Sequence, residues 1–472
     1  MNRDLLLLWA CLFVGGMELY AQAPNRMNVL FIVADDMNGY GVWKEYPLAQ
    51  TPYLDKLASQ SLNFTHAACN APVCVPSRAS FFSGIAPHVS GAYLNGSDPW
   101  RTSEVLQRAE SLPECFKRNG YITSGHGKIF HAKLGGTRHQ EMWDNPVFMG
   151  GFGPFPASPD EWLGGAKFRS VKAWEGPDSD FPDNVNAEQA ISFLQEDHEA
   201  PFFLFYGLWR PHTPYTAPKR FFEPFEDVDM PFPPGMVPGD LEDVPGLGQE
   251  LVDSLFVIFR TDGQPDSAKL KRFLQGYCAT TLFADWNIGR VLEALDSSRY
   301  ADNTVVIFCS DNGYHVGEKM HWQKATLWDQ ADLVPFMIRL PGGKVASCDQ
   351  PITLLDVYPT LVELCQLEPP HQSLDGQSLV PILQQPETEG TTPALTTLNV
   401  GYASVRDERY RYIIYPDGSE EAYDYRKDPH ELDNLIGTRK GAKIRKRLAD
   451  YLPETYAPSI GGKWEVAKAR GK

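Results

Sequence analysis

The 472-residue sequence has eight cysteines, and none of them forms the Cys-x-x-Cys pair of a zinc or disulfide-exchange site. They are Cys11, Cys69, Cys74, Cys115, Cys278, Cys309, Cys348 and Cys365. Their wide spacing leaves any disulfide pairing open. Internal repeats and low-complexity segments are also absent from the sequence. The composition, 43% hydrophobic and 22% charged, is that of an ordinary globular protein.

Positive charge is in deficit, because 43 Lys and Arg stand against 60 Asp and Glu, a net charge of −17. This balance argues against general binding to nucleic acid or to an anionic membrane. The one long apolar run, Leu5–Met17, follows Arg3 and precedes Ala21 and Ala23, as in a secretory signal peptide, so no membrane span is expected. We expect cleavage of a signal peptide over residues 1–23, after Ala21 or Ala23, and export to the periplasm or beyond in a bacterial host.

Three apolar runs of strand length are typical of central parallel strands that are buried on both faces. They are Asn28–Ala34, Pro201–Gly207 and Asn303–Ser310. Helical patterns between them predict a large α/β domain over residues 24–384, with a mainly parallel central sheet flanked by helices. After about residue 385 the pattern changes to short strands, and this predicts a smaller C-terminal α+β domain with an antiparallel sheet over residues 385–472.

A helix expected over Arg439–Tyr451 closes this smaller domain and carries a basic cluster. Its members are Arg439, Lys440, Lys443, Arg445, Lys446 and Arg447. Such a cluster can contact a polyanion or form a solvated helix face, and the sequence alone favours the solvated face.

Two of the apolar runs end in adjacent residues with oxygen-bearing side chains. Asp35-Asp36 follows the first run and Asp311-Asn312 follows the third. Ligands of open α/β sheets bind beyond the carboxyl ends of the strands, where neighbouring carboxylates repel each other unless a cation lies between them. A solvated turn is the alternative. Carboxylate and amide oxygens suit Ca²⁺ or Mg²⁺ better than Zn²⁺, so we expect a site for one such ion.

Basic side chains also follow predicted strands. Lys128 and His131 come after the strand expected at Gly120–Ser124, and His212 follows the second apolar run. Lys324 lies thirteen residues beyond Asp311. Each of them alone could be a surface charge. Gathered at one edge of the sheet, they predict a small cationic pocket in an otherwise acidic protein.

The stretch Cys74–Gly84 carries the most specific pattern in the chain, Cys-Val-Pro-Ser-Arg followed by Gly six residues after the Arg. Pro76 suits the first turn of a helix, so we expect a helix over Ser77–Ser83 with Cys74 just ahead of its N-terminus. Unpaired N–H groups there favour an anion, and Arg78 adds a cationic fork suited to a tetrahedral oxyanion. The alternative is a small buried thiol beside a proline turn.

This pattern resembles the signature of the type I, formylglycine-dependent sulfatases, and the resemblance covers nearly the whole chain. Asp35-Asp36, Thr51-Pro52-x-Leu54-Asp55 and Asp311-Asn312-Gly313 also match, as does the late series Tyr423-Asp424, Asp428-Pro429, Glu431-Leu432 and Asn434-Leu435. Three further motifs resemble the iduronate-2-sulfatase-like branch: Gly127-Lys128-x-Phe130-His131, Pro211-His212-x-Pro214 and Gly317-Glu318 with Lys324. The resemblance implies an alkaline-phosphatase-like fold for the large domain. Asn312 is a departure, because some members of that branch have His there.

The resemblance implies that Cys74 is converted to formylglycine (3-oxoalanine) by a formylglycine-generating or an anaerobic sulfatase-maturating enzyme. It assigns one ion, Ca²⁺ or Mg²⁺, to Asp35, Asp36, Cys74, Asp311 and Asn312. It further implies that Arg78, Lys128, His131, His212 and Lys324 hold the sulfate and serve the leaving group. The aldehyde hydrate has two hydroxyls, so one attacks sulfur and the other collapses to the aldehyde and expels sulfate. A thiol adduct has no second hydroxyl and could not complete this cycle.

The expected substrate is a sulfated saccharide from an extracellular polysaccharide, with a 2-O-sulfated uronate suggested by the branch. We expect Arg210, His321 and Trp322 to contact the sugar, with a rim salt bridge as the alternative for Arg210. One competing hypothesis is a phosphomonoesterase or phosphodiesterase on the same fold, although Lys128 and Lys324 take the space of a second metal. The other is a non-catalytic protein that binds sulfated glycans.

Overall fold

The computed structural model describes residues 26–131, 137–147, 150–158, 161–162, 166–252, 259–261, 264–387 and 392–460. The expected signal peptide over residues 1–23 lies outside them. Among the residues described, no helix is both long enough and apolar enough to cross a bilayer.

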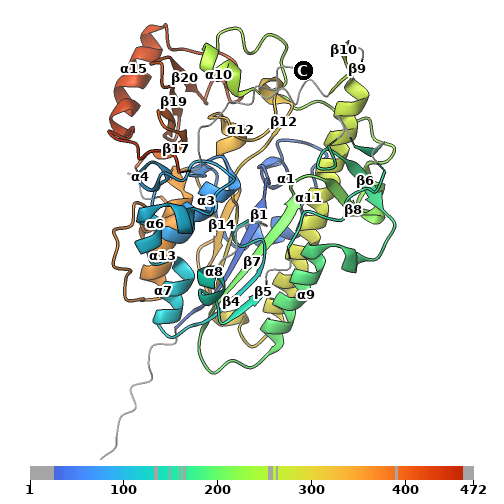
Figure 1. The fold of residues 1–472 in the computed structure, drawn as a ribbon, viewed down its shortest axis with the longest axis vertical. Coiled ribbons are helices and arrows are strands. Elements are labelled where there is room, and N and C mark those ends of the chain that lie inside the picture. Colours follow the sequence, from blue (N-terminus) through green and yellow to red (C-terminus); the bar gives the residue numbers. More distant parts are fainter. Residues whose placement is uncertain are drawn as a thin grey trace, which may run out of the picture.

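An eight-stranded sheet forms the centre of the molecule (Figure 1). In spatial order it contains β15 (Ala346–Cys348), β2 (Leu62–Phe64), β14 (Phe336–Arg339), β11 (Thr304–Ser310), β1 (Asn28–Asp35), β7 (Phe202–Pro211), β4 (Ile122–Gly127) and β5 (Asn145–Val147). Only the two pairings of β14 are antiparallel, so the mainly parallel sheet expected from the sequence is confirmed.

The central strands are apolar throughout because both faces of the sheet are covered. Every residue of β1 is buried, and its side chains alternate between two hydrophobic clusters. Val29, Phe31 and Val33 face one cluster, whereas Leu30 and Ile32 face the other. A half-exposed strand would alternate between apolar and polar residues, so the continuous run indicates burial on both faces.

Helices lie on both faces of the sheet (Figure 1). One face packs against α3 (Cys74–Ser83), α7 (Leu112–Arg118) and α13 (Val357–Leu364). The other packs against α2 (Pro52–Ala58), α9 (Pro182–Gln195) and the long α11 (Ser267–Asp296).

The C-terminal part contains the expected antiparallel sheet, with strands in the order β17 (Ala394–Asn399), β18 (Tyr402–Arg406), β19 (Tyr410–Ile414) and β20 (Glu420–Asp424). Helix α15 (Arg439–Leu448) packs on this sheet through Ile444 and Leu448, which contact Val405 and Tyr412 in one small cluster.

Buried ion pairs join the C-terminal sheet to the large part of the molecule. Arg411 on β19 is 1% exposed, and its guanidinium contacts Asp329, Asp332 and Glu431, the last at 2.8 Å. Arg406 on β18 also pairs with Asp329. Because removal of one partner leaves a buried charge uncompensated, this network fixes how the two parts pack.

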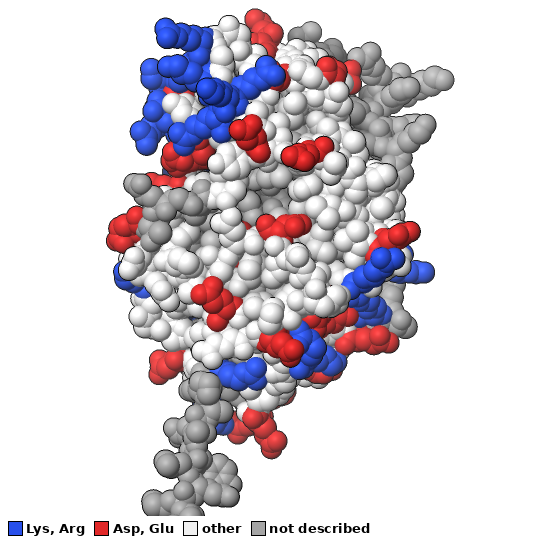
Figure 2. Space-filling view, turned by 90° about the vertical axis from the view of Figure 1, so that its left-hand side faces the viewer, with Lys and Arg blue, Asp and Glu red and all other residues white. Residues whose placement is uncertain are grey.

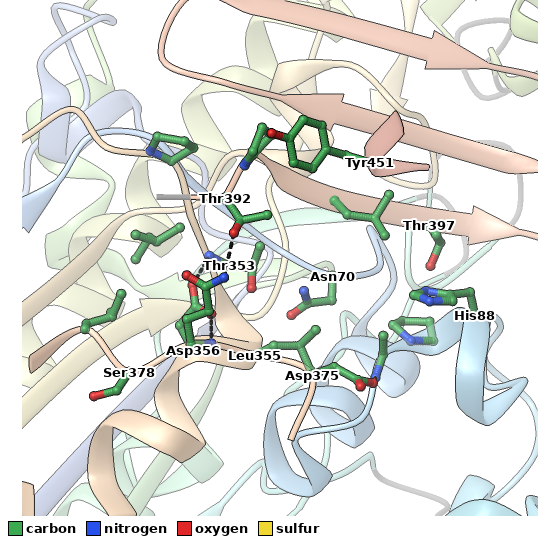
Figure 3. A pocket seen from close by; sticks show the side chains of 18 of the residues that line it. Asn70, His88, Thr353, Leu355, Asp356, Asp375, Ser378, Thr392, Thr397 and Tyr451 are labelled. Atoms are coloured by element: carbon green, nitrogen blue, oxygen red, sulfur yellow. Dashed lines mark hydrogen bonds between the residues drawn. The ribbon is translucent and has the colours of Figure 1, made fainter. Parts of the chain in front are cut away.

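A cavity of about 200 Å³ lies between α4 (Pro87–Ser90) and β17 (Figure 3). Buried polar groups of Asn70 and Thr397 line it, and neither side chain has a hydrogen-bond partner in the described ranges. Its lining includes none of the residues that the sequence analysis assigned to catalysis or metal binding. This cavity is therefore separate from the candidate active site.

Candidate active site

The two acidic pairs meet at the carboxyl edge of the sheet because β1 and β11 are parallel neighbours. Ala34 is paired with Ser310, so Asp35-Asp36 and Asp311-Asn312 leave the sheet side by side. The backbone N–H of Asp36 donates to Asp311 Oδ1 at 3.3 Å. Asp36 adopts φ 66°, a left-handed conformation that aspartate tolerates better than most residues, and the chain turns there directly after the strand.

Cys74 is the first residue of α3, three residues earlier than the helix start expected from Pro76. A proline is tolerated anywhere in the first turn, because the N–H groups of that turn have no partner within the helix. The side chain of Val73, the N-cap residue, makes no capping bond. Cys74 itself is fully buried and its sulfur faces the acidic edge of the sheet.

The acidic residues and Cys74 form a geometry that fits one cation. Ligand atoms of Asp35, Cys74 and Asp311 all lie within 4.8 Å of one another. Asp35 Oδ1 and Asn312 Oδ1 are buried oxygens that have no hydrogen-bond partner among the described residues. Such burial is costly unless a cation or a water satisfies them. Oxygen-rich ligand sets of this kind suit Ca²⁺ or Mg²⁺.

Lysines 128 and 324 approach the same carboxylates. The Lys128 ammonium is buried and pairs with Asp35, and the Lys324 ammonium pairs with Asp36 and lies 3.7 Å from Cys74 Sγ. Burial opposes the charge of Lys324, but Asp36 and Cys74 outweigh burial and raise its pKa. Gly127 directs Lys128 inward: it has φ 78°, and a Cβ there would lie 2.0 Å from the Gly207 carbonyl oxygen.

Two histidines flank this centre. His212 Nε2 lies 3.7 Å from Asp36 Oδ2, while its Nδ1 is 2.6 Å from the Thr213 carbonyl oxygen. Since a carbonyl can only accept, Nδ1 carries a proton, and in the neutral ring Nε2 holds the lone pair that faces the site. Burial lowers the pKa of His212. Burial and the nearby Lys128 lower the pKa of His131 to about 3, and its ring packs against Phe152.

Arg78 is fully buried behind the acidic edge. Its Nε donates to Asp311 Oδ2 at 2.7 Å, and Nη1 donates to the carbonyl oxygens of Lys128 and of Ile129, the latter at 3.2 Å. Within the part of the chain that the structure describes, Nη2 has no hydrogen-bond partner. The guanidinium therefore orients Asp311 and the backbone at Lys128 and Ile129. The sequence analysis expected Arg78 to hold the sulfate and did not predict this orienting role.

The structure does not support the expected sugar contacts. Arg210, His321 and Trp322 are each about 1–2% exposed or less. The Arg210 guanidinium donates to the carbonyl oxygens of Thr216 and Phe152 at 3.0 Å, and Trp322 Nε1 donates to the Tyr215 hydroxyl at 3.1 Å. These side chains support the walls of the site, because the segments after β7 and β11 fold inward over them.

Asn95 lies at the centre of the site, and the sequence analysis did not assign it a role there. Its Oδ1 accepts a hydrogen bond from the Val75 backbone N–H at 3.0 Å, and its Nδ2 lies 3.4 Å from Cys74 Sγ. It comes from a loop between short helices, 21 residues after Cys74. Asn95-Gly-Ser97 matches a glycosylation sequon, a pattern that does not indicate a place in an active site.

The fold is of the alkaline-phosphatase-like class, and its acidic sheet edge forms a candidate site for one cation. The sulfatase family profile matches residues 27–367, and the profile of the N-sulphoglucosamine sulphohydrolase C-terminal region matches residues 317–457. The chain belongs to the sulfatase family and is a sulfuric ester hydrolase.

Individual relatives agree with this assignment. The chain is 34% identical to a sulfatase of Formosa agariphila over 97% of its own length and 92% of the relative's. It is 30% identical to human iduronate 2-sulfatase over 80% and 71% of the two chains. Among solved structures, phosphonate monoester hydrolase of Agrobacterium radiobacter has a TM-score of 0.72 at 22% identity, covering 90% of this chain and 94% of that one. The last likeness shows the alkaline-phosphatase-like fold.

Proposed function

We propose that this protein is an exported sulfatase that removes sulfate esters from sugars of a sulfated polysaccharide or its oligosaccharides. The observation that carries the proposal is the convergence of Cys74 with Asp35, Asp311, Lys324 and Asn95 at one buried point. Export is inferred from the N-terminal sequence, and the periplasm or the extracellular space is the proposed location.

Residue 74 acts as formylglycine after modification by a maturating enzyme. In the hydrated aldehyde, one hydroxyl oxygen forms a bond to sulfur as the bond from sulfur to the sugar oxygen breaks. The second hydroxyl then loses its proton, the carbon–oxygen bond to the sulfate breaks, and the aldehyde is restored. Asn95 holds residue 74 through the first turn of α3 during both steps.

One Ca²⁺, with Mg²⁺ as the alternative, would be held by Asp35, Asp36, Asp311, Asn312 and residue 74, and would supply positive charge beside the reacting oxygens. Arg78 orients Asp311 toward that position through the hydrogen bond from its Nε. The unpartnered oxygens of Asp35 and Asn312 support this assignment.

Lys128 and Lys324 offset the negative charge that grows on the transferred group, because both ammonium groups are already fixed within the site. His212 gives a proton to the departing sugar oxygen. Its Nδ1–H is anchored on the Thr213 carbonyl oxygen, so Nε2 holds the lone pair of the neutral ring. Nε2 therefore first takes up the proton that the attacking hydroxyl loses, and then donates it to the sugar oxygen. His131 completes the wall on which the sulfate rests.

The likeness to human iduronate 2-sulfatase supports a 2-O-sulfated uronate as the substrate unit. The test is sulfate release from a panel of defined sulfated saccharides, with the protein co-expressed with a formylglycine-generating enzyme and Cys74→Ala as the control. Release from a 2-O-sulfated uronate, absent in the control, supports the full proposal. Release only from other sulfate positions rejects the uronate but keeps the sulfatase chemistry.

The same panel includes a phosphate monoester, a phosphate diester and a phosphonate ester, because an enzyme of the same fold hydrolyses phosphonate monoesters. Faster turnover of one of these by the Cys74-dependent enzyme would replace the sulfatase proposal. Binding of a sulfated glycan without any turnover, by protein shown to carry formylglycine, would favour a binding protein.

A further inference from the structure

Helix α15 is the most strongly cationic element in an acidic protein. Six of its ten residues are Lys or Arg, in a chain of net charge −17. Its buried residues are Gly441, Ile444 and Leu448, so the apolar side faces the C-terminal sheet and the cations point outward.

The charge pattern of the first half of this helix acts against its stability. Arg439 and Lys440 occupy the first turn, where the helix dipole favours anions, and no acidic residue is present there. Lys443 follows Arg439 by four residues, and like charges at this spacing repel. The cations of the last turn, Lys446 among them, lie where the dipole favours positive charge. The helix itself therefore does not explain the placement of Arg439 and Lys443, which points to a role outside the fold.

Half of the cations are neutralised by neighbouring acids. Lys440 pairs with Asp424, Arg445 with Glu420 at 3.0 Å, and Arg447 with Asp407 and Glu408. The other three, Arg439, Lys443 and Lys446, are exposed and have no ion pair among the residues that the structure describes.

These three residues form one row, which we call the α15 cationic face. Steps of four and seven residues return to the same side of an α-helix, and the row is ~10 Å long at 1.5 Å per residue. Figure 2 looks at the side of the molecule that carries α15 and shows Lys and Arg gathered near its top. In Figure 1, α15 lies at the same end of the molecule as β12 (His315–Val316) and α12 (Asp329–Asp332). Both elements follow β11 in sequence, beyond the carboxyl edge of the sheet at which the acidic pairs meet.

We propose that the α15 cationic face, Arg439, Lys443 and Lys446, binds the sulfated polysaccharide chain at a position outside the catalytic pocket. This inference rests on the proposed function and deepens it, because it states how a polymer is held while one of its esters is hydrolysed. Sulfate half-esters keep their negative charge at every physiological pH, and a row of flexible cations can contact successive sulfates without a fixed register.

The chemistry of the surface favours this partner over other polyanions. An anionic bilayer would require apolar side chains that enter it, and the apolar residues of α15 are buried against β18 and β19. A nucleic acid duplex presents a broad, densely charged face that the net charge of −17 repels. A single saccharide chain needs only a narrow cationic row.

The test compares two triple variants with the unchanged protein. The first is Arg439→Gln, Lys443→Gln and Lys446→Gln, which removes the three unpaired charges and keeps good helix formers. The matched control is Arg101→Gln, Arg108→Gln and Lys344→Gln, three exposed cations on other elements with no ion pair in the described part of the chain. Binding to heparin, chondroitin sulfate and ulvan is measured by affinity electrophoresis at several salt concentrations, with unsulfated hyaluronan and duplex DNA as comparison polymers.

We expect the α15 variant to bind at least one sulfated polymer roughly tenfold more weakly at low salt, and the control variant to bind as the unchanged protein does. The salt dependence of the α15 variant should also be shallower, because fewer counterions are released. Its thermal midpoint should be equal or higher, since repulsion within the helix is relieved. Equal binding by all three proteins, or a loss confined to DNA, overturns the proposal.

Kinetics separate this inference from the proposed function. With a small sulfated saccharide, the α15 variant should keep kcat and KM, whereas with the polymer its KM should rise and kcat should stay unchanged. If no protein releases sulfate from any substrate, the proposed function fails while the binding comparison still decides the role of α15. A loss of activity on the small saccharide would overturn the inference, because it would place α15 in the catalytic machinery.

Discussion

The side-chain amide of Asn95 lies 3.4 Å from the sulfur of Cys74, and its oxygen accepts a hydrogen bond from the N–H of Val75 at 3.0 Å. The Val75 N–H lies in the first turn of α3, where N–H groups have no partner within the helix. The side chain of the N-cap residue Val73 makes no capping bond, and Asn95 accepts from the Val75 N–H instead. This residue, which contacts both Cys74 and Val75, comes from a loop in which no catalytic motif is present.

Asn95→Ala should lower kcat by about 10- to 100-fold with little change in KM, because residue 74 loses its fixed position. Sulfate release is measured on protein whose residue 74 has been assayed for formylglycine by peptide mass spectrometry. Asn399→Ala, in a strand of the C-terminal sheet, is the control. Wild-type kcat in a fully modified Asn95→Ala protein would show that Asn95 has no positioning role.

Arg78→Lys should lower the free energy of unfolding by about 3–5 kcal/mol, because a lysine cannot contact Asp311 and the two carbonyl oxygens together and leaves a buried carboxylate poorly paired. Arg220→Lys is the matched control. Arg220 is exposed and donates to Asp178 Oδ1 at 2.7 Å, so this change should cost less than about 1 kcal/mol. Urea denaturation measures both, and equal losses in the two variants would contradict the assignment of Arg78.

Removal of divalent metal with a chelator should lower the thermal midpoint, and added Ca²⁺ should restore it. At a Ca²⁺ concentration of 100 times Kd, binding to the folded state alone contributes ~2.7 kcal/mol. Asp35→Asn should abolish this shift. Asp356→Asn changes another buried aspartate outside the site and should keep it. A midpoint that does not respond to Ca²⁺ in the unchanged protein would argue against the metal site.

Asp285 gives a pH dependence that is independent of the active site. This buried side chain on α11 accepts hydrogen bonds from the N–H groups of Tyr53 and Leu54 at 3.0 and 2.8 Å, at the start of α2. Burial raises its pKa to about 7. Since the folded state then binds a proton that the unfolded state releases, this residue adds stability as pH falls from 7 toward 4.

The stability advantage of the unchanged protein over Asp285→Asn should therefore be larger at pH 5.5 than at pH 8. Urea denaturation at the two pH values measures it, with the exposed Asp197→Asn as the control. An advantage that shrinks on acidification would mean that Asp285 is ionised in the folded protein throughout this range.

The sequence contained enough information for the central sheet, because continuous apolar runs such as Asn28–Ala34 have few other interpretations. The acidic pairs were located for the same reason: they end two of those runs, and parallel neighbours place their carboxyl ends together. The helical pattern of Ala279–Leu295 predicts only the later part of α11, which begins twelve residues earlier, at Ser267. Asp266 caps that helix by accepting from the Lys269 N–H, a signal that the sequence did contain.

The sequence alone did not predict which polar and aromatic side chains are buried by segments that lie far away along the chain. Arg210 and Trp322 are of residue types that often bind sugars, yet both are enclosed by segments distant in sequence. Asn95 contacts Cys74 only through the path of a loop, so neither spacing nor periodicity points to it. The row of unpaired cations on α15 also depends on which of its neighbours find acidic partners across the C-terminal sheet.

The central claim is that residue 74, once modified, releases sulfate. The most direct measurement follows sulfate release from a simple aryl sulfate by protein co-expressed with a formylglycine-generating enzyme, and correlates its rate with the fraction of residue 74 found as formylglycine. If formylglycine at residue 74 carries out sulfate release, we expect the rate to rise in proportion to this fraction and to be lost in Cys74→Ala. A rate that is the same in Cys74→Ala, or that does not follow the fraction modified, would contradict it.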